Sequence, residues 1–165
     1  MRRILPVLTA VLGVLVAGCA YGFAGGGLPR HVRTVAVIPF ENQTPLPELQ
    51  REINDALRIG LEQRLGLRDA AEDRADAVVR GTIVRFEPDV PVAFSADAAR
   101  SSSVRRRMQI VLDVEIFDQV SGRVLWEKKG LSAEGEYSER QEAAGRKQAI
   151  DRIVADVIEG AQSQW

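Results

Sequence analysis

The pattern of apolar and polar residues predicts four strands and two helices in the order strand, helix, strand, strand, strand, helix. Strict alternation marks the strands, and apolar residues at i, i+3, i+4 and i+7 mark the helices. The predicted strands cover residues 34–40, 77–86, 108–117 and 123–131, with the last extending towards Tyr137. The predicted helices cover residues 47–65 and 139–162.

The faces of these elements predict the fold class. Each helix has a single apolar stripe, and the strand over 108–117 has one apolar and one mostly polar face. The simplest arrangement that buries all of these apolar surfaces packs both helices on the apolar face of the sheet. We therefore expect an α+β two-layer sandwich (β-α-β-β-β-α), in which two helices cover one face of an approximately four-stranded, mostly antiparallel sheet.

Breaks in the pattern place the connections. Pro39 is expected near the end or at a bulge of the first strand, and Pro88 and Pro91 are expected to end or bend the second. Residues 93–103 are mostly Ala, Ser and Asp with little pattern, which predicts a loop. Residues 118–122 are typical of a hairpin turn.

The N-terminus has the form of a targeting leader. Arg2 and Arg3 precede an apolar run over residues 4–16, which is too short to span a bilayer as a helix. The run ends in Ala17-Gly18-Cys19, which resembles a bacterial lipobox. The resemblance implies cleavage before Cys19, a diacylglyceryl group on its sulfur and acylation of its amine, and several acyl chains give stable anchoring.

The leader divides the chain into three predicted parts. Residues 1–18 are the signal peptide, 19–33 a lipid-anchored Gly-rich tether and 34–165 a single domain. The residue after the cysteine is Ala20, whereas Asp at this position resembles an inner-membrane retention signal. This difference favours the periplasmic face of the outer membrane.

Composition and charge limit the kinds of binding partner that are expected. Apolar residues make up 45% of the 165, enough for a packed core. The formal net charge is -1, and loss of Arg2 and Arg3 with the leader leaves 20 basic and 23 acidic side chains. A nucleic-acid-binding domain needs a basic excess, so nucleic acid is not an expected partner. A single cysteine cannot form an intramolecular disulfide.

Catalytic and metal-binding patterns are missing from the sequence. His31 is the single histidine and has no cysteine or suitably spaced carboxylates beside it, so we interpret it as an exposed polar residue before the first strand. Gly25-Gly26-Gly27 lacks the ending of a phosphate-binding loop and precedes a strand instead of following one. We predict that the protein is not an enzyme and uses no metal or cofactor.

A basic cluster is the sharpest binding candidate. Arg105, Arg106 and Arg107 begin the third predicted strand, and guanidinium groups can bind phosphates in bidentate fashion. The hairpin is expected to bring Lys128 and Lys129 towards the same end of the sheet, and Arg100 lies in the adjacent loop. The alternative is a solvated sheet edge with protective charges.

Several segments together resemble the LptE family of lipopolysaccharide-assembly lipoproteins. The matching stretches are Cys19-Ala20-Tyr21-Gly22-Phe23, Gly27-Leu28-Pro29, 34–44, 75–83 and 122–127. The resemblance implies a two-layer domain that plugs and helps assemble an LptD-type β-barrel, and that binds lipopolysaccharide through basic loop residues. Arg100, Arg105, Arg106, Arg107, Lys128 and Lys129 are the corresponding candidates here.

One segment departs from the family pattern. The connection between the first helix and Ala75 is short and acidic, which argues against a small extra strand there. An alternative assignment is another periplasmic lipoprotein, such as a CsgG-like secretion component or an activator of cell-wall synthases, whose opening strand also ends in Pro-Phe-Glu-Asn. CsgG-like chains carry membrane-spanning hairpins, and no amphipathic ten-residue pair suits that role here.

Overall fold

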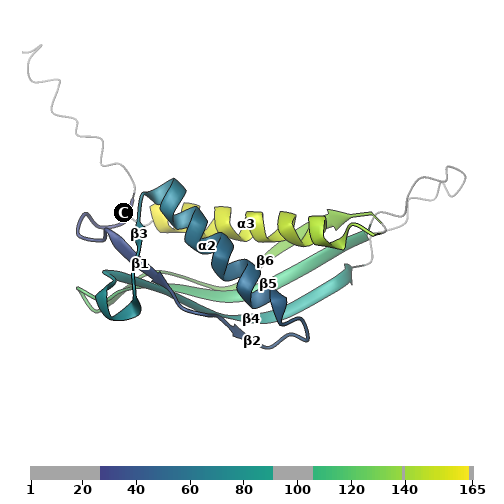
Figure 1. The fold of residues 1–165 in the computed structure, drawn as a ribbon, viewed down its shortest axis with the longest axis horizontal. Coiled ribbons are helices and arrows are strands. Elements are labelled where there is room, and N and C mark those ends of the chain that lie inside the picture. Colours follow the sequence, from purple (N-terminus) through teal and green to yellow (C-terminus); the bar gives the residue numbers. More distant parts are fainter. Residues whose placement is uncertain (1–26, 91–105, 139, 164–165) are drawn as a thin grey trace, which may run out of the picture.

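The computed structural model describes residues 27–90, 106–138 and 140–163. The leader, Cys19, most of the tether, Arg100 and Arg105 lie outside these ranges. In the described residues, two α-helices cover one face of a six-stranded sheet (Figure 1). The predicted α+β class, with both helices on one face, is confirmed.

Three long strands form most of the sheet. They are β4 (Ala77–Val90), β5 (Arg106–Asp118) and β6 (Arg123–Tyr137), joined antiparallel to one another. The first strand, β1 (Thr34–Val37), lies parallel to β4, and with the short strand β3 (Arg68–Asp69) on its other side the order is β3-β1-β4-β5-β6. The sheet is therefore mixed, with the predicted antiparallel pairing confined to its long strands.

The first predicted strand is interrupted. Ile38 N–H donates to the carbonyl of Val79, but Pro39 has no N–H to continue the ladder. The chain then pairs again as β2 (Glu41–Asn42), also parallel to β4. The proline was expected near the end or a bulge of this strand, and it separates β1 from β2.

A small extra strand follows the first helix, so the expectation of none there was wrong. This strand, β3 (Arg68–Asp69), pairs parallel with β1 and leads into a 3-10 turn over Glu72–Arg74. The N–H of Arg68 donates to the carbonyl of Arg33, and that of Ala70 to the carbonyl of Val35. An otherwise open edge of β1 is thereby paired.

The second and fourth strands run further than the apolar pattern indicated. β4 continues through Pro88 to Val90, with its register against β5 shifted between Glu87 and Val90. β6 reaches Tyr137, the outer limit that was predicted. The hydroxyl of Tyr137 donates to the carbonyl of Pro88, which ties the far ends of the two strands together across β5.

Both helices bury the predicted stripes. In α2 (Glu48–Leu65), Leu49, Ile53, Leu57 and Leu61 are at most 1% exposed. Gly66 ends α2 in the left-handed conformation, and its N–H donates to the carbonyl of Glu62, as in the αL motif. The N–H of Leu67 donates to the carbonyl of Leu61. In α3 (Glu142–Ser163), the buried stripe is Ala149, Ile150, Ile153, Val154, Val157, Ile158 and Ala161.

The helices run in the same direction and cross. α2 lies over β1 and the short strands, whereas α3 lies along β5 and β6 (Figure 1). They approach most closely at Gly60, where an added Cβ would lie 2.4 Å from Cγ1 of Val154. Further towards their N-termini, Arg146 of α3 donates two hydrogen bonds to Glu52 of α2, at 2.7 and 3.1 Å.

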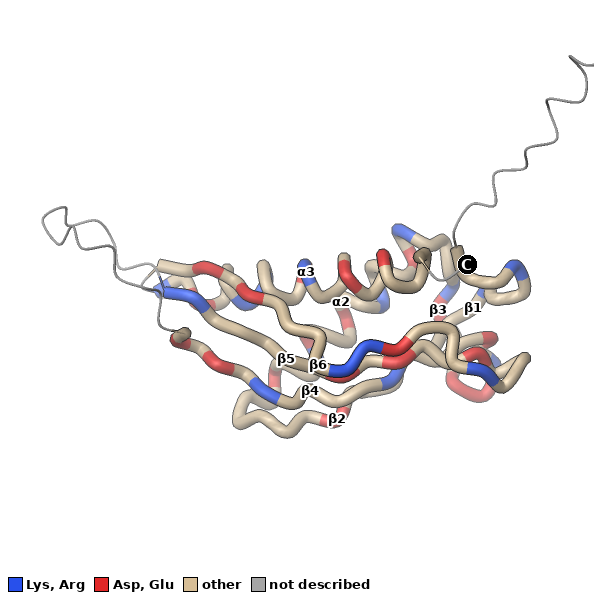
Figure 2. The backbone as a smooth tube through the Cα atoms, turned by 180° about the vertical axis from the view of Figure 1, so that it is seen from behind, with Lys and Arg blue, Asp and Glu red and all other residues tan. Residues whose placement is uncertain are grey.

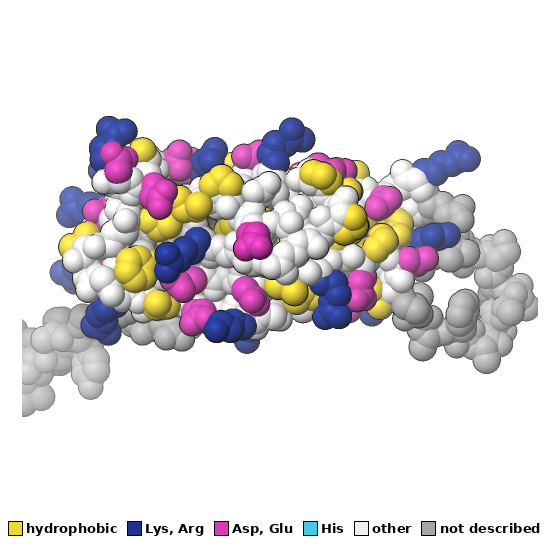
Figure 3. Space-filling view, turned by 90° about the horizontal axis from the view of Figure 1, so that it is seen from below, with side chains coloured by type: hydrophobic (Ala, Val, Ile, Leu, Met, Phe, Trp, Pro, Cys, Tyr) yellow, Lys and Arg dark blue, Asp and Glu magenta, His cyan; other side chains and the backbone are white. Residues whose placement is uncertain are grey.

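The opposite face of the sheet carries charged side chains with scattered apolar ones between them (Figure 3). Arg80 pairs with Glu115 at 2.7 Å and lies over the ring of Phe117, 5.3 Å from its centroid. A second, small apolar cluster of Ala36, Ala75 and Val78 is covered at one end by the segment that follows α2. Phe117 is half-buried on this face, whereas Trp126 is buried on the other face and packs against α3.

Candidate functional site

Two of the candidate arginines lie at one end of the sheet, which we call the loop end because residues 91–105 connect its strands there (Figure 2). Arg106 and Arg107 begin β5 and are half-buried. Arg106 pairs with Asp89 at 3.3 Å, and Arg107 with Glu134 at 3.3 Å and Glu136 at 3.6 Å. The guanidinium groups are therefore held in place by partly exposed carboxylates.

The two lysines do not reach this end, so the expectation that the hairpin brings them beside the arginines was wrong. Lys128 lies opposite Val114, seven residues along β5 from Arg107, or about 23 Å at roughly 3.3 Å per residue. Lys129 is exposed and pairs with Glu127 at 3.3 Å. Figure 2 shows the basic pair midway along β6.

The other end of the sheet, which we call the tether end, holds a buried carboxylate. Asp118 closes β5 and is 1% exposed, and its Oδ2 lies 2.7 Å from Nε2 of His31. It accepts further hydrogen bonds from the hydroxyl of Ser121 and from the N–H groups of Val120 and Ser121. Burial raises the pKa of Asp118, but these hydrogen bonds outweigh it and lower the pKa from 3.8 to about 2.

A second carboxylate fixes the same end. Asp76 accepts hydrogen bonds from the N–H groups of Arg33 and Thr34 and from the hydroxyl of Thr34, all at 2.8 to 2.9 Å. The N–H of Arg33 lowers the pKa of Asp76 most, followed by the Thr34 hydroxyl. Together with Asp118, it ties the start of β1 to the β3–β4 connection and to the β5–β6 hairpin.

The hydrogen bonds around Asp76 and Asp118 hold parts of the fold together and do not have the geometry of a catalytic site. Asp118 stands between His31 and Ser121, so the histidine does not face the hydroxyl as the base of a nucleophile must. His31 is exposed, as expected, with 43% of its side chain accessible, and its ring also contacts Asp118. In the described ranges, no three His, Cys, Asp or Glu side chains converge as a metal site would require.

A groove of about 710 Å³ lies between α2 and α3 on the side away from the sheet. Its apolar lining includes Ile59, which is 51% exposed, and the buried side chains of Ile150 and Val154. The Glu52–Arg146 pair crosses it, and the hydrogen bonds that Arg146 donates to Glu52 raise the pKa of Arg146. Among the described residues, every buried side-chain nitrogen and oxygen has a hydrogen-bond partner.

None of the helices in the described ranges is both long and apolar enough to cross a bilayer. The class defined by these features is a small two-layer α+β domain with ion-paired basic residues at one end and a hydrogen-bonded start of the chain at the other. No curated protein matches the sequence.

The fold itself is shared with solved structures of low sequence identity. The PelC dodecamer from Paraburkholderia phytofirmans is 17% identical with a TM-score of 0.53, covering 84% of this chain and 95% of that one. XCC0632 from Xanthomonas campestris is 14% identical with a TM-score of 0.52, covering 76% and 81%. CT253 from Chlamydia trachomatis is 15% identical with a TM-score of 0.50, covering 78% and 97%.

The family model described as LptE, lipopolysaccharide-assembly, matches residues 32–160. The match covers all six strands, α2 and all of α3 except its last three residues. The chain therefore belongs to the LptE family of lipopolysaccharide-assembly proteins, and the resemblance noted in its sequence is confirmed.

Proposed function

We propose that this protein is an outer-membrane lipoprotein, anchored through Cys19 at the periplasmic face, that partners an LptD-type β-barrel and binds lipopolysaccharide without catalysis. The observation that carries the proposal is the LptE family match over residues 32–160. The family's assembly role is non-catalytic, which agrees with the prediction from sequence that the chain is not an enzyme.

The lipobox at Cys19 supports the anchoring half of the proposal. The chain enters the domain at the tether end, where hydrogen bonds to Asp76 and Asp118 hold residues 31–34 against the sheet. A lipid on Cys19 holds the domain near the membrane and so raises its effective concentration near a barrel in that membrane.

The partner is tested by isolating the lipidated protein from outer membranes in mild detergent. Recovery of a stoichiometric LptD-type barrel supports the proposal. Recovery with a cell-wall synthase, or as a ring of identical subunits without a barrel, would instead support a different envelope lipoprotein. A Cys19→Ser variant, which cannot be lipidated, serves as the control for anchoring.

For lipopolysaccharide, the loop end is the preferred candidate. Arg106 and Arg107 present two guanidinium groups there, and their carboxylate partners are exposed enough for a phosphate to compete with them. Arg100 and Arg105 belong to the same proposed site. Lys128 and Lys129 lie too far along β6 to contact the same phosphate and are proposed as a separate, weaker contact.

The lipopolysaccharide site is tested by replacing Arg105, Arg106 and Arg107 together with alanine. Weaker lipopolysaccharide binding at low salt, with a smaller loss on adding salt than in the unmodified protein, supports the site. The matched control removes the same charge elsewhere, in R51A/R74A/R85A, and should bind as the unmodified protein does. Unchanged binding in the first variant at both low and high salt would end the idea.

A further inference from the structure

The tether end of the domain carries exposed arginines without carboxylate partners. Arg30, Arg33, Arg64, Arg68 and Arg123 are all exposed, and none has an ion-pair partner within the described ranges. Arg106 and Arg107 at the loop end, by contrast, pair with carboxylates there. We call these five residues the tether-end arginines.

Pairing and hydrogen bonds bring the five together from separate parts of the chain. Arg68 of β3 is the register partner of Thr34, and its N–H donates to the carbonyl of Arg33. Arg64 and Arg30 line one small cavity beside Gly27. Arg123 of β6 is the register partner of Asp118 in β5, and the carboxylate of Asp118 contacts His31.

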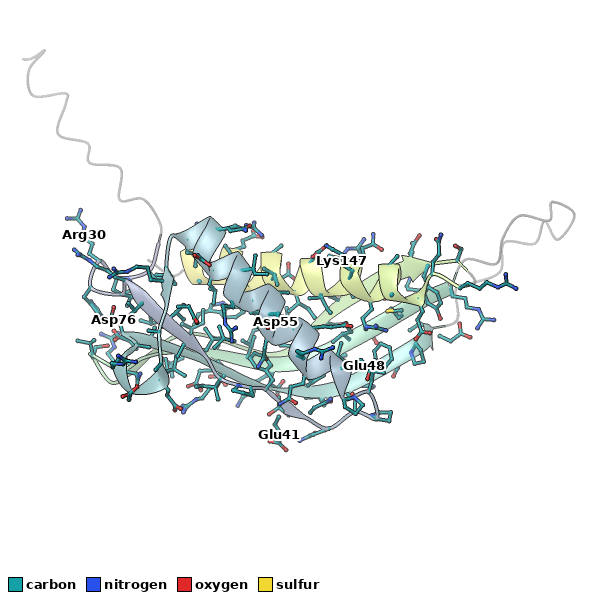
Figure 4. The ribbon with its side chains drawn as sticks, viewed as in Figure 1. Arg30, Glu41, Glu48, Asp55, Asp76 and Lys147 are labelled. Carbon is teal, nitrogen blue, oxygen red and sulfur yellow. The ribbon has the colours of Figure 1, made fainter. Side chains whose placement is uncertain are left out.

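Most of the exposed charged side chains that have no ion-pair partner in the described ranges are basic at this end, although the protein as a whole has a net charge of -1. Asp76 and Asp118 lie nearby but are occupied by hydrogen bonds from within the domain. At this end, three exposed carboxylates have no ion-pair partner in the described ranges, namely Glu62, Glu72 and Glu159, against the five arginines. Figure 3 shows Lys and Arg side chains around this end, and in Figure 4 Arg30 points outward from it.

The short segment between the lipid-anchored Cys19 and Gly27 limits how far this surface can lie from the membrane. Gly27 lies eight positions after Cys19, and a flexible chain of eight residue steps has an r.m.s. extent of roughly 16 Å and a maximum of about 26 Å. A lipid on Cys19 therefore holds the tether end close to the membrane surface. The Debye length is about 8 Å at physiological salt, so the arginines lie within a few screening lengths of the lipid phosphates.

We propose that the tether-end arginines form a membrane-facing surface that binds anionic phospholipid head groups and fixes which end of the domain meets the bilayer. Guanidinium groups suit this partner because they bind phosphate oxygens in pairs and are less strongly hydrated than ammonium groups. A lipid anchor together with a basic patch is a general two-signal arrangement for membrane attachment. The proposal rests on the lipidation of Cys19 but not on the identity of the barrel.

The experiment uses the mature lipidated protein in vesicles of phosphatidylcholine, or of phosphatidylcholine and phosphatidylglycerol in equal parts. Amide hydrogen exchange is followed in peptides covering residues 27–34 and 119–124. On anionic vesicles, exchange at these peptides is expected to slow by about tenfold, and added salt should reverse the effect. Exchange in β4 and β5 is expected to be the same in both vesicles.

Two triple variants, each of which removes three positive charges, distinguish the effect of where the charges lie from the effect of net charge. R30Q/R33Q/R68Q should lose the slowing on anionic vesicles, whereas R51Q/R85Q/K147Q, with its changes away from the tether end, should keep it. Equal exchange on the two kinds of vesicle, or slowing that survives the first triple variant, would overturn the proposal.

The mass of the N-terminal peptide reports separately on the anchor. An unlipidated Cys19 would overturn the anchoring half of the proposed function and this membrane contact with it. A lipidated Cys19 with equal exchange on both vesicles would overturn the contact alone.

Discussion

Nε2 of His31 lies 2.7 Å from Oδ2 of Asp118, across 87 positions of sequence. The contact fastens the segment before β1 to the hairpin that joins β5 and β6. Because the same carboxylate also accepts three hydrogen bonds from Val120 and Ser121, one buried side chain holds both the hairpin turn and the start of the domain.

Replacing Asp118 by alanine should therefore destabilise the domain strongly. The change leaves four donors unsatisfied, and we expect a loss of about 2–4 kcal/mol in the free energy of unfolding, measured by urea denaturation. D113A is the matched control, because Asp113 is more exposed and accepts one hydrogen bond, from Gly130, so its loss should be about 1 kcal/mol. Equal losses in the two variants would contradict the role given to Asp118.

Acid should weaken the fold through the same residue. The pKa of Asp118 is lowered from 3.8 to about 2 in the folded state, so its ionised form stabilises the fold above pH 3.8 and this stabilisation is lost as pH falls towards 2. We expect about 2 kcal/mol of unfolding free energy to disappear across this range. D118N should flatten the slope between pH 4 and 2, leaving the smaller contribution of Asp76, whose pKa is also lowered.

Gly160 allows α3 to lie close to β6. A Cβ at this position would lie 2.2 Å from Cε2 of Trp126, and a buried ring cannot move aside cheaply. G160A should thus destabilise the domain by about 1–3 kcal/mol, although alanine favours a helix over glycine by about 1 kcal/mol. In a W126L background the penalty should shrink, and thermal melts of the four proteins complete a double-mutant cycle. A penalty unchanged by W126L would show that the ring is not the obstacle.

The bond between the helices gives a fourth prediction. Arg146 is 15% exposed and donates two hydrogen bonds to Glu52, so R146A should cost about 1–2 kcal/mol and R146K, which cannot form the paired contact, nearly as much. Lys147 and Asp151 form an exposed pair on one helix, and K147A should cost less than about 0.5 kcal/mol. Chemical denaturation of the three variants tests the order.

Periodicity was sufficient for the long elements because each of them buries one face. The stripes of α2 and α3 and the alternation of β5 are properties of single segments, so their class and their common packing face could be predicted. The strand β3 could not be predicted in this way. It has only two residues, both polar and exposed, and it forms because β1 offers backbone groups that need partners.

For the hairpin of β5 and β6, the direction of the returning strand was easier to predict than how far along it each residue lies. The chain does turn back after Asp118, as predicted, but β6 continues to Tyr137, so Tyr137 and not Lys128 reaches the level of Arg106. The bond between His31 and Asp118 had no local signal at all, since neither residue belongs to a pattern that involves the other. Such long-range polar contacts depend on where the elements pack, which the spacing of apolar residues does not specify.

The thirteen residues of β5 separate the loop end from the tether end. At roughly 3.3 Å per residue the strand spans about 40 Å, more than the hydrocarbon thickness of a bilayer, about 30 Å. With the tether end held at one leaflet and β5 normal to the membrane, Arg106 stands a full bilayer's depth from the lipids that hold the anchor. The domain is then a rigid spacer, and its length sets how far from the anchored leaflet a phosphate can be bound.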